Sequence, residues 1–251
     1  MKTTATEVVI ALQFADPLPH LNAIQIASIT DGFAEFPRFA ELPVSGPMPY
    51  SLEQLDGTEP INGFVASFPR IALGSEDGDR TLTFQADRLT YSWVRTAELL
   101  DEDDYPGFDE LVKELQPVIE RFATLVQETA NVTVSYKVAE LTYVNVIPTR
   151  TPDNEPIRLS TLFAFLAPVP NSPGVNGYFH AWNEKLGVAE GVLRLQVNGP
   201  VLYAPEKPGA SFTLAGTFLI SDAQQLPQEL LAVRQRIGET YGRVLATGSA
   251  R

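Results

Sequence analysis

Two long segments of the sequence carry the apolar repeat of an amphipathic helix, and each directly follows strand-like segments. In residues 105–129 and 222–247, large apolar side chains recur at spacings of three and four, which places them on one side of a helix. The repeat consists of Phe108, Leu111, Leu115, Ile119, Phe122 and Val126 in the first segment, and of Leu226, Leu230, Val233, Ile237, Tyr241 and Leu245 in the second. Because a helix with one apolar side must bury it against another element, we expect both helices to pack on a sheet built by the preceding strands.

The strand-like segments mostly follow one another without a helix between them. They occupy residues 7–14, 61–73, 80–85, 88–94, 131–148, 157–170, 189–205 and 210–221. Consecutive strands favour antiparallel pairing, and the sequence has no glycine-rich turn of the kind that marks parallel nucleotide-binding folds. The sequence therefore predicts an α+β fold, in which long amphipathic helices pack on one face of a mainly antiparallel, curved sheet.

Several local features refine this expectation. A helix over residues 20–39 would place Leu21, Ile24, Ile26, Ile29 and Phe33 on one side and end at Pro37. Residues 40–60, rich in proline, are expected to form a surface loop. Pro69 suggests an edge strand or a bulge, and residues 139–140 suggest another bulge.

The apolar phase changes between the two strands at residues 80–94. Leu82 and Phe84 are even-numbered, whereas Leu89 and Tyr91 are odd-numbered, so one straight strand cannot bury both pairs. A tight turn or bulge over residues 86–88 resolves the conflict.

The length of 251 residues suits a single composite domain over residues 1–251. Since strands lead into a long helix twice, pseudo-duplication is one interpretation, with halves 1–147 and 148–251.

The charge and the cysteine content exclude several classes of function. A net charge of −13 repels phosphate backbones, so we expect no direct nucleic-acid binding, whereas a basic protein partner is compatible with it. The absence of cysteine excludes disulfides, thiol nucleophiles and cysteine-bound metals. The N-terminal apolar run is short and is followed by Asp16 and Pro17, so we expect neither a signal peptide nor a membrane span, and a cytoplasmic location.

Motifs for catalysis are missing, and we expect no catalytic residue, no metal and no cofactor. The sequence contains no nucleophile elbow, no phosphate-binding loop and no GxGxxG. His20 and His180 lack the spacing of a metal site and are interpreted as structural. The acidic run at residues 101–104 is interpreted as the start of the following helix, where Asp104 or a neighbour would cap the first turn.

Aromatic side chains close to an arginine form the candidate site. Trp93 and Arg95 share a strand face with Tyr91, and such aromatic–arginine stripes bind planar ligands or partner proteins. Tyr136 and Tyr143 are candidates to line the same concave surface. The alternative is that Trp93 belongs to the core under the helix at residues 107–128, and we expect it to be largely buried.

The stretch "YSWVR", the Tyr105–Pro106 pair and the amphipathic helix that follows resemble a sporadically distributed bacterial family of about 250 residues, catalogued as uncharacterised. The segments "VVIALQF", "EFPRF" and "GTFLIS" extend the resemblance over nearly the whole chain. Ser92, where the family would have Asn, and the lack of a histidine in the last helix depart from it. The resemblance implies an α+β fold without an established activity, and a link to toxin–antitoxin, immunity or phage-defence genes.

Three hypotheses for the function follow. The first is a non-enzymatic, cytoplasmic protein that binds another protein, such as a toxin or defence component, and that is compatible with a homo-oligomer. The second is a small-molecule binder with a cavity between the curved sheet and the helices. The third is a carboxylate-dependent metal enzyme, which is the least favoured because it requires an ion site that the sequence does not indicate.

Overall fold

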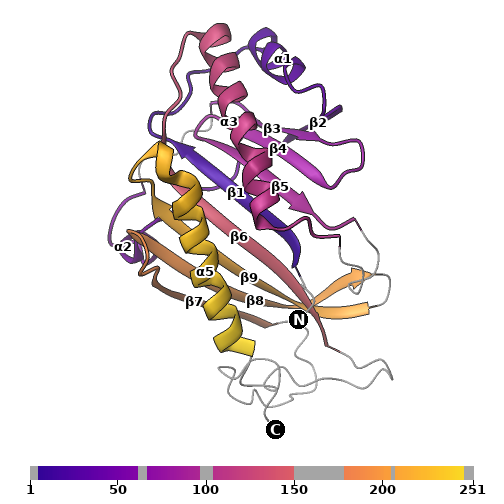
Figure 1. Cartoon of the computed structure of the whole chain (residues 1–251), viewed down its shortest axis with the longest axis vertical. Helices are drawn as coiled ribbons and strands as arrows, with labels where there is room; N and C mark the ends of the chain where they lie inside the picture. Colours follow the sequence, from indigo (N-terminus) through magenta and orange to yellow (C-terminus); the bar gives the residue numbers. More distant parts are fainter. Residues whose placement is uncertain (1–4, 62–66, 97–103, 150–177, 205–206, 246–251) are drawn as a thin grey trace.

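The computed structural model has a nine-stranded, fully antiparallel sheet with helices packed on it (Figure 1), and confirms the predicted α+β fold. The structure describes residues 5–61, 67–96, 104–149, 178–204 and 207–245. The predicted strand over residues 157–170 and Asp101 to Asp103 of the acidic run lie outside these ranges.

The strands run in the order β2-β3-β4-β5-β1-β6-β9-β8-β7, so β1 is the central strand. Their bounds are β1 Ala5–Phe14, β2 Arg38–Leu42, β3 Arg70–Gly74, β4 Arg80–Gln85, β5 Arg88–Val94, β6 Tyr136–Pro148, β7 Tyr178–Lys185, β8 Gly191–Ala204 and β9 Lys207–Leu219. Apart from the edge strand β2, which has no counterpart, the order is symmetric about the boundary between β1 and β6. On one side β3, β4 and β5 return to β1, and on the other β7, β8 and β9 return to β6. A long helix follows each set in the sequence, and pseudo-duplication stays a prediction.

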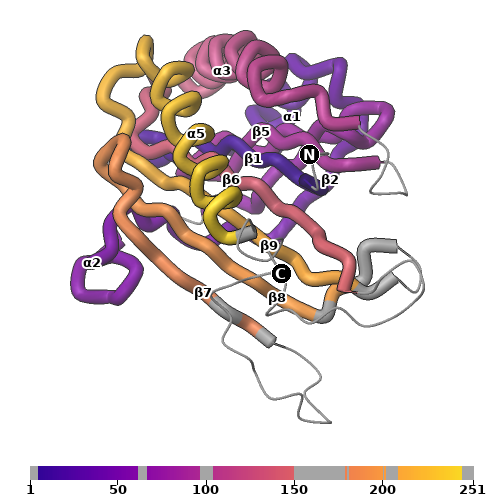
Figure 2. Tube along the Cα trace, turned by 60° about the horizontal axis from the view of Figure 1, so that its bottom comes forward, coloured from indigo at the N-terminus to yellow at the C-terminus, as the bar shows by residue number. Residues whose placement is uncertain are grey.

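In the described part of the chain, three helices cover one side of the sheet, here called the helix face (Figure 2). They are α1 Ala23–Asp31, α3 Phe108–Ala130 and α5 Leu226–Leu245, which follows the short 3₁₀ helix η1 Ala223–Gln225. Phe84 of β4 packs on Phe122 of α3 with ring centroids 5.4 Å apart, and the two rings are fully buried. Helix α5 approaches β9 closely at Gly216, where a Cβ atom would lie 2.5 Å from Val233. These contacts place the main core between the helices and the sheet.

The opposite side of the sheet, here called the open face, carries a different element. We call residues 43–60 the strap; they contain the short helix α2 Leu52–Leu55 and cross one end of this face. Met48 of the strap packs on Ala11 of β1 and Val138 of β6, and α2 reaches β7. The proline-rich segment, predicted as a surface loop, is therefore partly buried and spans both halves of the sheet.

A buried polar network anchors the strap to the turn between β4 and β5. The fully buried Asp87 carboxylate accepts hydrogen bonds from Gln85 (2.6 Å) and from Arg88 (2.9 Å). The Gln85 amide also bonds both backbone groups of Ser45, and Arg88 donates to the carbonyl of Gly46 at 2.5 Å. Every side chain of the network thus has partners, which is the condition under which buried polar groups are tolerated.

Some local predictions are confirmed and others are wrong. The tight turn predicted from the phase change is present, because β4 and β5 pair directly with a turn at Ala86–Asp87. No bulge occurs at residues 139–140; the register shifts lie elsewhere in the β1–β6 pairing, between Ala5 and Glu7 and between Gln13 and Phe14. A bulge there would have disturbed the alternation that buries Ala139.

The expected edge strand and first helix also differ. β3 begins after Pro69 and is not at an edge, because the unexpected strand β2 lies outside it. α1 is shorter than predicted, and Ile24 is 82% exposed because the helix buries a narrower stripe around Ile29. Asn22 caps α1 in a capping box with Gln25.

Candidate functional site

Tyr91 and Trp93 both lie on the helix face of β5 and are almost fully buried, at 4% and 1% exposure. The predicted burial of Trp93 is confirmed. The Tyr91 hydroxyl donates a 2.7 Å hydrogen bond to Glu114 of α3. Burial, reinforced by this bond to a carboxylate, raises the pKa of Tyr91 well above its ordinary value.

Glu114 also receives a two-pronged contact from Arg80 of β4, at 2.7 Å and 3.0 Å. Partial burial acts to raise the pKa of Glu114, but the hydrogen bonds from Arg80 and Tyr91 outweigh it, so the pKa is lowered. This triad fastens the N-terminal half of α3 to β4 and β5.

Trp93, Arg95 and Tyr143 come together through Tyr105, in the segment that leads into α3. The Tyr105 ring packs on Trp93 with centroids 5.0 Å apart, and its hydroxyl lies 3.3 Å from that of Tyr143. Arg95 lies over the Trp93 ring at 5.7 Å and forms a 2.9 Å ion pair with Asp104. The structure therefore joins three of the five predicted residues in one cluster.

The prediction that Asp104 caps the first turn of α3 is wrong. The N-cap of α3 is Gly107, which provides no side-chain hydrogen bond, and Asp104 bonds Arg95 and the backbone N–H of Thr96 instead. Asp104 thus fixes the chain that leads into α3 rather than capping its first turn.

Tyr136 lies apart from this cluster. Its ring packs on Phe14 with centroids 5.8 Å apart, at the start of β6, and burial raises the pKa of its hydroxyl. The five predicted residues therefore occupy three places. As contacts to a ligand or partner they stay a prediction, and their observed contacts lie within the fold.

The open face carries hydroxyl side chains on neighbouring strands of both halves. Register places the following residues on it: Thr81, Thr83, Thr90, Ser92, Thr142, Ser211, Thr213 and Thr217. Most of them are half-buried, and in the described part of the chain α2 is the sole helix on this side (Figure 2). The alternation of polar and apolar residues in β4 and β5 signalled a polar face, but not which strands would lie beside one another.

Two carboxylates of the open face differ in their surroundings. Glu140 of β6 accepts hydrogen bonds from Arg194 (2.5 Å), Thr217 (2.6 Å) and Thr142 (3.2 Å). The side chain of Glu7 on β1 has no hydrogen bond or ion pair within the described residues, and burial raises its pKa above the ordinary value of 4.5. No sequence motif marks either residue as part of a site.

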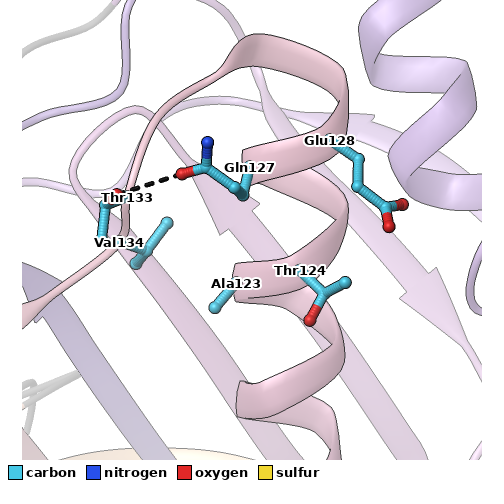
Figure 3. Close-up of a pocket in the computed structure, with 6 residues that line it drawn as sticks. All are labelled: Ala123, Thr124, Gln127, Glu128, Thr133 and Val134. Atoms are coloured by element: carbon cyan, nitrogen blue, oxygen red, sulfur yellow. Dashed lines mark hydrogen bonds between the residues drawn. The ribbon is translucent and has the colours of Figure 1, made fainter.

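A hollow of about 460 Å³ lies beside the C-terminal end of α3 (Figure 3). It is lined by Ala123, Thr124, Gln127, Glu128, Thr133 and Val134. Its polar groups are partly engaged already, since Thr133 donates to the Gln127 amide oxygen at 3.0 Å. None of the predicted site residues lines it.

Neither a metal centre nor a membrane-spanning helix is found among the described residues. There, no three histidine, aspartate or glutamate side chains gather to hold a metal ion. The Nδ1 atom of His20 lies 2.7 Å from the carbonyl of Ser67, and the side chain of His180 is outside the described set. Across the same ranges, no helix has the length and apolar character needed to cross a membrane.

Comparison with known proteins gives no family model and no curated protein that matches the chain.

Proposed function

We propose that the protein is a non-enzymatic, cytoplasmic binding module that docks another protein on the open face of its sheet. The observation that carries this proposal is the extent of the open face. Outside the strap, most of the serine and threonine side chains of the open face are half-exposed in the described part of the chain. The helix face, by contrast, is packed against helices. Half-exposed threonine and serine side chains offer donors and acceptors without the cost of stripping water from full charges.

The chemistry of the partner follows from the charge. With a net charge of −13, the protein attracts basic surfaces and repels acidic ones over the range of the Debye length. We propose a basic protein as the partner, and the resemblance to a sporadically distributed family suggests a toxin or defence component. A homo-oligomer is compatible with this function.

The test places one arginine in each half of the open face, as Thr83→Arg on β4 and Thr213→Arg on β9. The matched control is Gln116→Arg on the exposed side of α3, which adds the same charge on the helix face. A partner purified from the native host with the wild-type protein should be retained by the control. Both open-face variants should bind it at least tenfold more weakly, since an inserted arginine disrupts complementarity. Equal retention by all three variants, once circular dichroism shows that they fold, would refute the proposal.

A second candidate function is small-molecule binding, and the hollow in Figure 3 is the observation that favours it. The place differs from the expected cavity under the helices, where Tyr91 and Trp93 pack in the core. Thermal-shift screening with polar metabolites tests this candidate. A stabilising compound should lose its effect in Ala123→Trp, which would fill the hollow, and a compound that stabilises this variant equally binds elsewhere.

A further inference from the structure

We propose that Glu7 is the point at which the open face binds a cationic side chain, lysine or arginine, of a protein partner. This inference rests on the proposed function and specifies the chemistry of one contact.

The position of Glu7 suits a central contact. It lies on β1, the middle strand of the nine, and its side chain points to the open face because Val8 and Ile10, in the alternate phase, are buried on the helix face. Its direct cross-strand neighbours are Val94 of β5 and Val144 of β6. The two positions directly opposite Glu7 therefore carry valine side chains rather than donors.

The lack of an internal partner distinguishes Glu7 from the other open-face carboxylate on a central strand. Glu140 is saturated by one arginine and two threonines. Glu7 has no such donor in the described part of the chain, and burial is the cause of its raised pKa. The half-buried Glu7 carboxylate has lost part of its hydration without gaining a hydrogen bond from the described part of the protein, so a cation that supplied donors would offset this loss on binding.

The valines around Glu7 narrow the choice of cation. Lysine and arginine side chains lay their aliphatic stems along apolar surface while the charged end reaches a polar group. A site with valines around one carboxylate fits this shape better than it fits a hydrated metal ion, which requires several oxygen ligands. The overall charge of −13 favours the approach of the same basic side chains.

The experiment uses two probes, n-butylammonium chloride for the lysine side chain and n-butylguanidinium chloride for arginine. Each is titrated into the full-length ¹⁵N-labelled protein at constant ionic strength, with sodium chloride as the reference salt. Glu7→Gln removes the charge, and Glu120→Gln, on an exposed position of α3, is the control with the same net charge. Backbone amide spectra first confirm that both variants keep the fold.

We expect saturable shifts at the amides of Val9, Val94 and Val144 in the wild type and in Glu120→Gln. The apparent dissociation constant of at least one probe should rise at least tenfold in Glu7→Gln. Absent or non-saturating shifts in the wild type, or equal binding by Glu7→Gln, would overturn the inference.

The partner assay separates this inference from the proposed function. If Thr83→Arg and Thr213→Arg release the partner but Glu7→Gln keeps it at full affinity, the proposed function stands and the role of Glu7 is refuted. If the two arginine variants retain the partner, the proposed function fails, and the role of Glu7 in partner binding fails with it, whatever the probes do. Release by Glu7→Gln together with its weaker probe binding supports both.

Discussion

Replacing Asp87 with alanine should destabilise the protein far more than a change at a hairpin turn ordinarily does. The Asp87 carboxylate is fully buried and neutralises Arg88, whose side chain is 8% exposed. Without it, Arg88 keeps its bond to the carbonyl of Gly46 but is left as a buried charge without a counter-ion. Removal of one partner of a buried ion pair costs about 3–5 kcal/mol, and the Gln85 amide loses an acceptor as well.

The assay is equilibrium unfolding in urea, followed by circular dichroism. The double variant Asp87→Leu/Arg88→Met should recover at least about half of the lost stability, because apolar side chains of similar size replace a buried pair with little net loss. Glu53→Ala, which removes an exposed carboxylate of the strap without a hydrogen bond or ion pair in the described part of the chain, is the control and should change stability by no more than about 0.5 kcal/mol. Hydrogen exchange at residues 45–50 should accelerate in Asp87→Ala and not in Glu53→Ala. A loss below about 1 kcal/mol for Asp87→Ala, or a double variant less stable than the single one, would refute the reasoning.

Three further predictions concern the scaffold. Trp93→Ala should lower the free energy of unfolding by about 3–5 kcal/mol in thermal or urea melts, because it removes a buried aromatic ring. Gly191→Ala should cost about 1–3 kcal/mol, because its Cβ would lie 2.2 Å from the backbone oxygen of Thr217, and an unchanged melting temperature would contradict this. The lowered pKa of Glu114 predicts stability that is present above pH 4.5 and is lost as the pH falls through the folded-state pKa below it. Melts between pH 2.5 and 6 should show less of this loss in Arg80→Met, since the lowered pKa depends on the Arg80 contact.

The elements that the sequence predicted share a strong apolar pattern. The helix at α3, the hairpin of β4 and β5, and the pairing of β8 with β9 each follow from side chains that are buried on one side and exposed on the other. β2 escaped prediction because most of its side chains are exposed, so its residues carry no alternation for the sequence to display. Tertiary position, rather than local propensity, makes it a strand.

The buried polar network could not be predicted for a different reason. Gln85, Asp87 and Arg88 occupy a hairpin turn, and charged residues at turns are ordinarily exposed. They are buried because the strap, which lies about forty positions earlier in the sequence, covers the turn. A sequence pattern reports which side of its own element a residue occupies, and it does not report which distant segment covers that side.

For the same reason, the sequence could not show that the five residues of the predicted site would lie in three separate places, most of them under the helices. Tyr91, Trp93 and Tyr143 share a face, as the odd-numbered phase of β5 indicated, but that face is the one that the helices cover. The residues that a partner could contact lie on the other face, at the alternate positions of each strand. In the sequence these are mostly hydroxyl residues, together with Glu7, and no motif marks them. Glu7 and Glu140 sit on adjacent strands at the centre of the sheet, yet β8 and β9 bring donors to Glu140 and the strands beside Glu7 bring valines. The difference between a carboxylate with internal donors and one without them is therefore a property of strand order and register, and it is on this difference that the proposed role of Glu7 in binding a basic partner depends.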